Sequence, residues 1–578
     1  RPGSDVTKDW IRALATTKRL LDCPFPGLPA IVQGQAENEP GRVALIGRDR
    51  TWTYAELAGR ANQYSRWALG QRLVTGDAVG LLMSNQPEYV AVWLGLTQVG
   101  CVTALLNPQL STAGLAHALD SASVRAVIAE SSILCRHEAR ACRLDRPWWE
   151  HGGSRGSARI DSAVAELPDG PLTADERRPA ALRAPALLVF TSGTTGHPKA
   201  VKITHARTLE WSGWFAGIMN ATPGARLYNC LPMFHSVGGV AALGAMLAAG
   251  GSTVTRDRFS ASRFWPDIVG SGATIFQYIG ELCRYLVQAE PCDEERRHRL
   301  RLACGNGLRA DVWKRFEQRF RVPQVLEFYA ASEGCVSLTN AEGKVGSVGR
   351  VPRFLAHRYP LALVRLDPVS EQPQRGTDGL CLRCGAGEPG EMIGRVDGSS
   401  LRFDGYTDTA ATQARYLRNV FRSGDLWFRS GDLMEQDSEG YYYFIDRLGD
   451  TYRYKGENVS TTEVASAIQS CALVYGVSLP GVEGKAGMAA LVVGKEFTLA
   501  GLSAHLADRL PSYARPLFIR ICRSLDATAT FRLRKNDYAR QGYEAASDPV
   551  WFFDADSGVH VPCDVRLAEK IEARSLKL

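Results

Sequence analysis

Residues 191–199 combine small, hydroxyl-bearing and basic side chains in an order suited to holding a polyphosphate. The segment follows the apolar run 185–190 and reads Thr191-Ser192-Gly193-Thr194-Thr195-Gly196-His197-Pro198-Lys199. Glycines let the backbone approach a ligand and turn N–H groups towards it, hydroxyls donate further hydrogen bonds, and the lysine supplies charge. No Gly-Lys-Ser/Thr closes the segment, so it is not a Walker sequence. Alone it could be an ordinary Gly/Ser turn, but the motifs downstream favour a phosphate-binding loop.

Further polar and small-residue segments follow this loop along the chain. They are Leu231-Pro232-Met233-Phe234-His235-Ser236, Gly305-Asn306-Gly307, Tyr329-Ala330-Ala331-Ser332-Glu333-Gly334, Ser430-Gly431-Asp432-Leu433 and Asp446-Arg447. Near the C-terminus the chain reads Thr528-Ala529-Thr530-Phe531-Arg532-Leu533-Arg534-Lys535. These segments contain carboxylate, basic and aromatic side chains, and their occurrence in a fixed order argues against an ordinary Gly/Ser turn at 191–199.

The elements that must position these residues alternate along the first part of the chain. Apolar segments at 77–83, 101–106, 126–129 and 186–190 predict buried strands, and the pattern at 88–99 predicts a helix. Such alternation is typical of a parallel sheet with helices on both faces. Residues 161–183, rich in Pro, Asp and Arg, are expected to form a surface linker.

The pattern changes near Glu439, where a short strand at 440–445 precedes Asp446-Arg447-Leu448-Gly449-Asp450. Beyond it lies a smaller α+β portion of about 130 residues, a plausible second domain. We therefore predict an α/β fold with a large domain of parallel or mixed sheets flanked by helices at 1–446, and a small α+β domain at 447–578.

Composition places this chain among ordinary globular proteins. The 578 residues exceed what one core usually supports, and 45% are apolar and 22% charged. The formal charge of +7 is scattered, which argues against nucleic acid and for an anionic small substrate. The 14 cysteines are spread out, and only Cys381 and Cys384 have metal-type spacing, so buried free thiols are expected. The apolar segment 237–251 is too short for a membrane span and predicts a core helix.

The motifs together resemble those of the AMP-forming adenylating enzymes. That superfamily includes acyl-CoA synthetases, peptide-synthetase adenylation domains and luciferases. Residues 278–286, Tyr278-Ile279-Gly280-Glu281-Leu282-Cys283-Arg284-Tyr285-Leu286, and residues 446–463, which contain Lys455-Gly456-Glu457-Asn458-Val459-Ser460, are similar to the fatty acid transport protein and very-long-chain acyl-CoA synthetase branch. The resemblance covers almost the whole chain.

The resemblance implies a two-step reaction. A carboxylate attacks the α-phosphorus of ATP and displaces pyrophosphate, and a second nucleophile, with CoA expected, then takes the acyl group from the adenylate. The first step depends mostly on positioning and charge neutralisation, because two anions must meet. The small C-terminal domain is expected to be a mobile lid that turns about 446–449 and exchanges Arg532 for the loop 455–460.

The resemblance also assigns residues. The phosphate loop holds the β- and γ-phosphates, Glu333 and Thr194 ligate Mg²⁺, Tyr329 lies against adenine, and Asp432 accepts from both ribose hydroxyls. The whole expected nucleotide site comprises Thr191, Ser192, Gly193, Thr194, Thr195, Gly196, Lys199, Gly305, Asn306, Gly307, Tyr329, Ala330, Ser332, Asp432, Arg447 and Gly456. The expected catalytic residues are Lys199, His235, Glu333 and Arg532.

The acyl site is expected beside His235, which falls where the family keeps an aromatic residue or histidine at the pocket mouth. A satisfied core histidine is the alternative. Four glycines allow two readings, because they would leave room for a long substrate or would only permit close packing of helix against sheet. They are Gly238, Gly239, Gly280 and Gly305.

Arg532 departs from the family pattern. Members of this branch read Thr-x-Thr-Phe-Lys-x-x-Lys, and here arginine occupies the position of the first lysine. Arginine keeps the charge but replaces a compact ammonium with a planar fork. Either Arg532 does the same work, or Lys535 substitutes for it, or the substrate is not an ordinary carboxylate, or charge alone suffices there.

The leading hypothesis is a cytoplasmic, bacterial-looking ligase that activates a fatty or aryl acid with ATP and Mg²⁺. An alternative of the same fold adenylates nitrite and diazotises an aromatic amine without CoA, in a biosynthetic pathway. A non-enzymatic acyl or nucleotide carrier is disfavoured, because it needs no metal-and-triphosphate site. No nucleic-acid partner and no transmembrane span are expected, whereas peripheral membrane contact and a monomeric or homodimeric state stay open. The chain opens without methionine, which leaves open the removal of a leader or anchor.

Overall fold

The computed structural model describes most of the 578 residues. The described ranges are 3–23, 27–110, 112–136, 146–153, 158–178, 181–192, 198–331, 333–367, 370, 372–396, 405–448, 452–454, 457–468, 471–480, 485–494, 496–525, 535–543 and 548–573. By its internal packing the chain forms two compact units. Unit 1 comprises residues 1–359 and 395–416, and unit 2 comprises residues 360–394 and 417–578. The predicted boundary between 446 and 447 stays a prediction.

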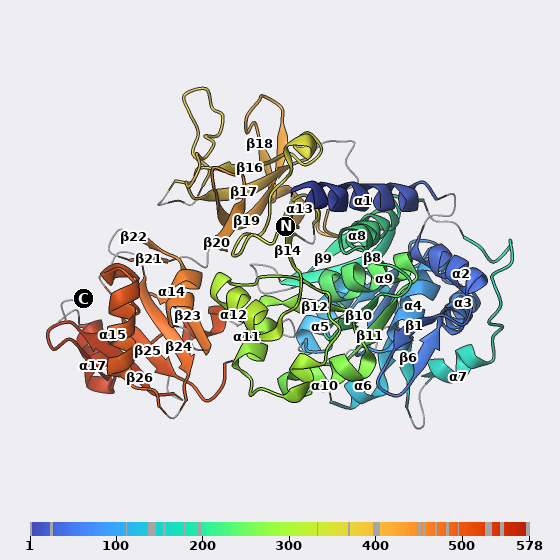
Figure 1. Cartoon of the computed structure of the whole chain (residues 1–578), viewed down its shortest axis with the longest axis horizontal. Helices are drawn as coiled ribbons and strands as arrows, with labels where there is room; N and C mark the ends of the chain where they lie inside the picture. The colour runs from blue at the N-terminus through green and yellow to red at the C-terminus, as the bar shows by residue number, and fades with distance from the viewer. Residues whose placement is uncertain are drawn as a thin grey trace. The chain divides into compact units, whose positions relative to one another are not determined.

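Unit 1 contains two large sheets of mostly parallel strands, coloured from blue to green in Figure 1. Within the described ranges, the first has the order β7 (Ala158–Arg159), β6 (Trp148–His151), β5 (Val124–Glu130), β3 (Ala78–Leu82), β4 (Val102–Leu105), β8 (Pro185–Ser192) and β9 (Pro198–Thr204). The second, counted over the same ranges, has the order β15 (Ser337–Asn340), β14 (Val325–Ala330), β13 (Leu302–Asn306), β12 (Ile275–Ile279), β10 (Arg226–Asn229), β11 (Ser252–Thr255), β1 (Val43–Ile46) and β2 (Thr51–Thr53).

Helices cover these sheets. They are α1 (Gly3–Leu21), α2 (Leu28–Asn38), α3 (Tyr54–Gly70), α4 (Pro87–Gln98), α5 (Thr112–Ser121), α6 (Ser131–Arg136), α7 (Ile160–Ala165), α8 (His205–Ile218), α9 (Leu243–Ala249), α10 (Ala261–Ser271), α11 (Gly280–Gln288), α12 (Ala310–Phe320) and α13 (Thr409–Gln413). Local sequence explains their ends: Thr53 and Glu56 form a capping box that starts α3, and Gly250, with φ 70°, ends α9. In Figure 1, α1 lies along α8.

Small residues let α1 and α8 approach closely. A Cβ added at Gly213 would lie 2.7 Å from the Thr17 Cα, and one added at Gly217 would lie 2.5 Å from the Ala13 Cα. The Arg12 Nε–H donates to the Gly217 carbonyl over 2.7 Å. The first helix is therefore an integral layer of unit 1.

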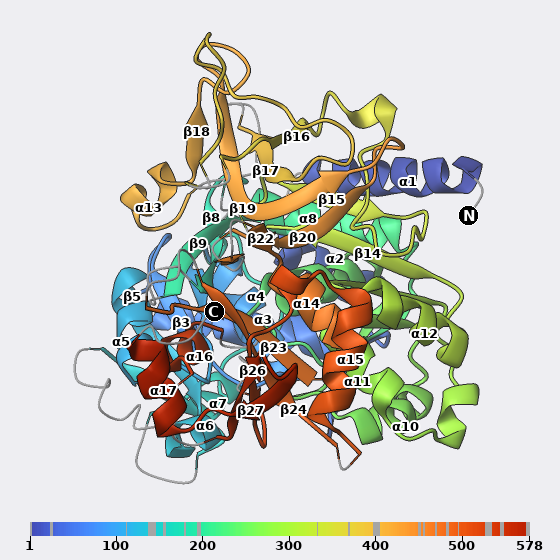
Figure 2. The ribbon, with the colours of Figure 1, turned by 90° about the vertical axis from the view of Figure 1, so that its left-hand side faces the viewer.

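Unit 2 contains β16 (Leu361–Val364), β17 (Gly390–Arg395), β18 (Tyr416–Arg418), β19 (Leu426–Gln436) and β20 (Tyr442–Arg447) in one sheet, and a short β21 (Tyr452–Tyr454) and β22 (Glu457–Val459) pair. Its last sheet has the order β23 (Cys471–Val477), β24 (Ala486–Val492), β25 (Phe518–Ile521), β26 (Val550–Asp554) and β27 (Val559–Pro562). The accompanying helices are α14 (Thr461–Ile468), α15 (Leu499–Arg509), α16 (Lys535–Gln541) and α17 (Val565–Glu572). Figure 2 shows α14 and α15 side by side next to this sheet.

The structure confirms the predicted fold class, a mixed α/β fold with a large N-terminal sheet domain and a smaller C-terminal one. It corrects the expected linker at 161–183, because α7 occupies its first five residues and buries Val164. The apolar segment 237–251 is helical and buried as predicted, but a π-helical turn, Ser236–Ala242, precedes α9. No helix in the described part is both long and apolar enough to cross a bilayer.

Candidate active site

The two ends of the predicted phosphate loop lie on paired strands. The strands β8 and β9 pair antiparallel, and their register places Thr191 opposite Lys199 and Ser192 opposite Pro198. Residues 193–197, which include Gly193, Thr194, Thr195 and Gly196, lie outside the described residues. The fold thus brings the lysine at one end of the motif next to the hydroxyl residues at the other.

Glu333 lies just beyond β14 in a tight turn. Gly334, with φ 82°, allows this turn, and its N–H donates to the Ala331 carbonyl over 2.8 Å. The Glu333 residue is only 6% exposed, and the Tyr406 hydroxyl donates to its Oε1. Burial and the adjacent Glu333 carboxylate raise the pKa of Tyr406, so this phenol keeps its proton. The neighbouring Ser332 lies outside the described residues.

The Gly305-Asn306-Gly307 loop begins at the carboxyl end of β13, next to β14. Gly305 is opposite Glu327 in the parallel register, so Tyr329 and Ala330 lie at the end of the adjacent strand. Tyr329 is half-buried and Ala330 is exposed. The structure therefore brings together the residues that were predicted to surround adenine, with the exception of the undescribed Ser332.

A buried carboxyl group holds this loop in place. Glu327 accepts hydrogen bonds from the Leu308 N–H over 3.0 Å and from the Tyr278 hydroxyl. Burial raises the pKa of Glu327 to about 8, although these hydrogen bonds act in the opposite direction. Glu327 therefore anchors the loop through a hydrogen bond to Leu308, and its raised pKa means that its carboxyl group is largely protonated at neutral pH.

His235 precedes the π-helical turn. Its backbone N–H donates to the Pro232 carbonyl over 3.2 Å, and its ring lies 4.6 Å from the Phe234 ring, measured between centroids. Burial lowers the pKa of His235 to about 4, so the side chain is neutral at physiological pH. A neutral imidazole suits contact with an uncharged part of a substrate better than capture of its carboxylate.

The four glycines considered for an open acyl pocket are instead sites of close backbone packing. An added Cβ would lie 2.6 Å from the Pro232 carbonyl oxygen at Gly238 and 2.0 Å from that of Met233 at Gly239. At Gly280 it would lie 1.8 Å from the Gly307 carbonyl oxygen, and at Gly305 2.2 Å from that of Tyr278. Because every such Cβ would overlap backbone atoms, these glycines are required for packing and leave no free volume of their own.

Asp432 and Arg447 meet on neighbouring strands of unit 2. They are directly opposite in the antiparallel register of β19 and β20, and Arg447 Nε lies 3.4 Å from Asp432 Oδ1. Asp432 is 6% exposed, whereas the Arg447 side chain is 52% exposed. The fold thus brings this predicted pair together.

Glu391 supports the turn that carries Asp432. Its buried carboxylate accepts from Arg429 Nη2 over 2.7 Å and from the Gly431 N–H over 3.2 Å. The Ser430 hydroxyl donates to the Met392 carbonyl over 2.6 Å and accepts from the Asp432 N–H over 3.1 Å. The predicted Ser430-Gly431-Asp432 segment is therefore rigidly held.

Two predicted residues of unit 2, Gly456 and Arg532, lie outside the described residues. Lys535, considered as a substitute for Arg532, begins α16 and donates from Nζ to the Thr461 Oγ1 over 2.5 Å. Its Nζ is also 4.0 Å from Asp446 Oδ1. In this structure the Lys535 ammonium is thus engaged by its own unit.

Sequence reasoning missed three residues that support the site, namely Tyr406, Glu327 and Glu391. Glu327 had a detectable signal, because it is an acid inside the apolar run 325–329. Tyr406 had none, since its partner is 73 positions away in the sequence. The cysteines described by the structure are free thiols, and most of them are buried as predicted, but Cys135 is exposed. No cluster of three or more His, Cys, Asp or Glu in the described ranges could hold a metal.

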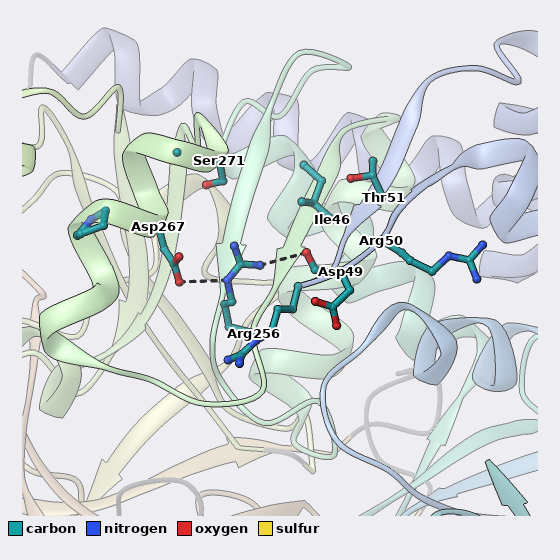
Figure 3. A pocket seen from close by; sticks show the side chains of 11 residues that line it. Ile46, Asp49, Arg50, Thr51, Arg256, Asp267 and Ser271 are labelled. Atoms are coloured by element: carbon teal, nitrogen blue, oxygen red, sulfur yellow. Dashed lines mark hydrogen bonds and ion pairs between the residues drawn. The ribbon is translucent and has the colours of Figure 1, made fainter. Parts of the chain in front are cut away.

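A hollow of about 390 Å³ lies elsewhere in unit 1, between the β1–β2 turn and α10 (Figure 3). Two of its arginines pair with acidic residues: Arg256 Nε lies 3.1 Å from Asp267 Oδ2, and Arg48 Nη2 lies 3.1 Å from Asp257 Oδ1. The guanidinium of the third, Arg50, lies 5.8 Å from the centroid of the Trp52 ring. None of the predicted site residues lines this hollow. This hollow is therefore separate from the candidate site.

The residues present fit ATP and Mg²⁺. Glu333 offers a buried carboxylate with one oxygen bonded to Tyr406, and carboxylate oxygen is a preferred ligand of Mg²⁺. The Asn306 Oδ1 is buried and accepts no hydrogen bond from the described residues, which suits a ligand donor such as a base amino group. Asp432 offers acceptors for hydroxyl groups.

Comparison with known structures supports the same fold. The anthranilate CoA ligase in complex with anthranoyl-AMP superposes with a TM-score of 0.76 at 21% identity, covering 91% of this chain and 99% of that one. The o-succinylbenzoate coenzyme A synthetase from Bacillus subtilis, in complex with ATP and magnesium ion, superposes with a TM-score of 0.69 at 22% identity, covering 88% and 98%. At these identities the likeness establishes the fold.

Sequence comparison establishes the family. The AMP-binding enzyme model matches residues 32–392, and the AMP-binding enzyme C-terminal domain model matches residues 463–532. Long-chain fatty acid transport protein 1 of Mus musculus is 38% identical over 571 residues, which is 95% of this chain and 88% of that protein. Long-chain fatty acid transport protein 3 of Homo sapiens is 38% identical over 525 residues, 88% and 76% of the two chains. The chain therefore belongs to the AMP-binding enzyme family, alongside the long-chain fatty acid transport proteins.

Proposed function

We propose that this enzyme activates a long-chain fatty acid with ATP and transfers the acyl group to CoA. The single observation that carries the site assignment is the buried Glu333 carboxylate, which Tyr406 links to the strand leaving the phosphate loop. The fatty substrate rests on relatives named as long-chain fatty acid transport proteins over almost the full chain. Their mammalian origin gives no support to a bacterial source, which stays a prediction.

The first half-reaction joins two anions. A carboxylate oxygen bonds to the α-phosphorus, the bond from that phosphorus to the bridging oxygen breaks, and pyrophosphate leaves. Lys199 and the phosphate loop hold the β- and γ-phosphates, and Glu333 with Thr194 holds Mg²⁺, which when bound offsets negative charge on the phosphates. Asp432 accepts hydrogen bonds from the ribose hydroxyls and Arg447 adds a contact to the ribose or a phosphate.

The second half-reaction transfers the acyl group. The CoA thiol loses its proton to solvent, its sulfur bonds to the acyl carbon, the bond from this carbon to the AMP oxygen breaks, and AMP leaves with the electron pair of that bond. His235 remains neutral because its pKa lies near 4, so it orients the acyl chain without titrating at neutral pH. The small domain, 447–578, is expected to move between the two half-reactions.

The experiment is an assay of pyrophosphate and AMP release with the purified chain, ATP and Mg²⁺. The acids are fatty acids of graded length and aryl acids, and each is tested with and without CoA. We expect long-chain acids to support pyrophosphate release without CoA and acyl-CoA formation only with it. A further arm supplies nitrite and an aminoarene, and the alternative reaction would release pyrophosphate only there. The relatives found do not favour that alternative.

A further inference from the structure

We propose that Tyr406 is a positioning residue that fixes the Glu333 carboxylate relative to the strand leaving the phosphate loop. The proposal rests on the proposed function and deepens it, because it names the group that orients the carboxylate expected to ligate the metal. Both residues belong to unit 1, and neither the motifs nor the resemblance singled out Tyr406.

The backbone around Tyr406 extends the sheet that carries the phosphate loop. The Lys202 N–H donates to the Gly405 carbonyl over 3.2 Å, and the Thr407 N–H donates to the Ala200 carbonyl over 3.0 Å. Tyr406 is thereby an antiparallel partner of Val201 on β9. This pairing fixes Tyr406 opposite Val201, which lies two residues after Lys199 on β9.

A second set of bonds holds the Tyr406 backbone from the other side. The Tyr406 N–H donates to the Thr412 Oγ1 over 3.0 Å, and this hydroxyl donates to the Asp408 carbonyl over 3.0 Å. Asp408 caps the N-terminus of α13 through the Ala410 N–H, over 2.9 Å. With strand pairing on one side and a capped helix on the other, the segment that presents the phenol is fixed at both ends.

The side chain then crosses from one sheet to the other. Tyr406 is 5% exposed, and its hydroxyl bonds to the Oε1 of Glu333, which follows β14 of the second large sheet. Because one carboxylate oxygen is committed to Tyr406, the orientation of the other is set as well. A buried carboxylate without this bond would lose both a hydrogen bond and its fixed rotamer.

The test uses Tyr406→Phe, which removes the hydroxyl and keeps the ring. Calorimetry measures the affinity for α,β-methylene-ATP with Mg²⁺ and, in a separate titration, with EDTA. Removing a group that orients a metal ligand usually lowers metal affinity or activity by about 10–100-fold. We expect Tyr406→Phe to lower the ratio of the two affinities by about that factor and to raise the Mg²⁺ concentration needed for half-maximal pyrophosphate release. The affinity for the nucleotide measured in the presence of EDTA should change little.

Tyr64→Phe is the matched control. The Tyr64 hydroxyl donates to Glu88 Oε1 over 2.6 Å, so it is another buried tyrosine–carboxylate bond of unit 1, among residues with no assigned role in the reaction. Both variants are expected to lower the melting temperature. Only Tyr406→Phe should change the ratio of the affinities with and without Mg²⁺, which separates positioning from general stability.

A double-variant cycle with Glu333→Gln tests whether Tyr406 acts through Glu333. If it does, Glu333→Gln lowers the Mg²⁺-dependent affinity ratio and adding Tyr406→Phe lowers it little further. Fully additive losses, or a Tyr406→Phe ratio equal to that of the folded wild type, would overturn the proposal. A wild type that binds the nucleotide with Mg²⁺ but adenylates no acid would refute the proposed function while leaving this result standing.

Discussion

The buried carboxyl group of Glu327 titrates differently from a carboxyl group at the surface. Its pKa rises from 4.5 to about 8 on folding, because burial in the apolar end of β14 disfavours the charge. Below pH 4.5 the group is protonated in both states. Between pH 4.5 and 8 the unfolded chain releases this proton and the folded chain retains it, so the stability the group contributes is lost as pH rises through the folded pKa.

Glu327→Gln, a neutral isostere, should remove this pH dependence. We expect the melting temperature of the variant, minus that of the wild type, to increase steadily from pH 5 to pH 8.5, because only the wild type must bury a charge at the upper end. Scanning calorimetry of both proteins across this range measures the difference. A difference that stays constant with pH would show that Glu327 titrates normally.

Arg532 and Lys535 are the two candidates for the basic residue that assists adenylation, and substitutions at the two positions are expected to have different effects. Since the Lys535 ammonium bonds to Thr461, we expect Lys535→Ala to lower the melting temperature and to retain adenylation. Arg532→Ala should depress adenylation while sparing transfer to CoA from a supplied adenylate. Arg532→Lys should preserve or raise adenylation of fatty acids, because it restores the compact donor of the family.

Single-turnover assays of the two half-reactions distinguish these cases. If Arg532→Ala adenylates at the wild-type rate and Lys535→Ala is inactive, Lys535 and not Arg532 supplies the positive charge for adenylation. Arg532→Lys that loses activity on nitrite and gains little on fatty acids would instead indicate that the arginine fork suits another oxyanion.

The elements around the Gly305-Asn306-Gly307 loop contain glycines because their backbones pack closely, and not because a substrate needs the space. Gly280 begins α11 at the point where it touches the Gly307 carbonyl. We expect Gly280→Ala to destabilise the enzyme by about 1–3 kcal/mol, the usual cost of overpacking, and to weaken ATP binding because the loop must shift.

Gly34, inside α2, has no atom within 4 Å of an added Cβ. Gly34→Ala should therefore stabilise by about 0.5–1 kcal/mol.

Chemical denaturation and ATP titration of both glycine variants measure these effects. If Gly280→Ala unfolds at the wild-type midpoint and instead accepts longer acids, the glycine borders substrate space and the packing account is wrong.

Local patterns predicted the elements well where periodicity was strong. The predicted strand at 77–83 is β3, Ala78–Leu82, and the predicted helix at 88–99 is α4, Pro87–Gln98, because apolar residues bury both. The pattern at 161–183 predicted a surface linker, and most of its described residues are irregular and at least partly exposed, but its Pro and Asp content concealed the short α7. The support of Glu333 by Tyr406 could not be predicted, because it depends on which distant segment pairs with β9.

At the scale of the whole molecule, the residues predicted to bind the nucleotide belong to two units. Lys199, Glu333 and the Gly305–Gly307 loop belong to unit 1, whereas Asp432 and Arg447 belong to unit 2. Asp446, at the predicted hinge, is 2% exposed, and its Oδ2 accepts from the Thr461 N–H over 2.7 Å and from the Thr461 Oγ1 over 2.8 Å. This residue is thus bound tightly to α14, which makes the start of α14 a firm part of unit 2.

Exchange of labelled pyrophosphate into ATP, driven by a long-chain fatty acid and Mg²⁺ without CoA, tests the central claim most directly. It reports formation and reversal of the acyl-adenylate and nothing later. We predict rapid acid-dependent exchange in the wild type. In Asp432→Ala the loss of charge-assisted hydrogen bonds, about 1.5–3 kcal/mol each, should lower exchange at limiting ATP by about ten-fold or more. The absence of exchange with every acid tried, or the appearance of ADP and phosphate as products, would contradict the account.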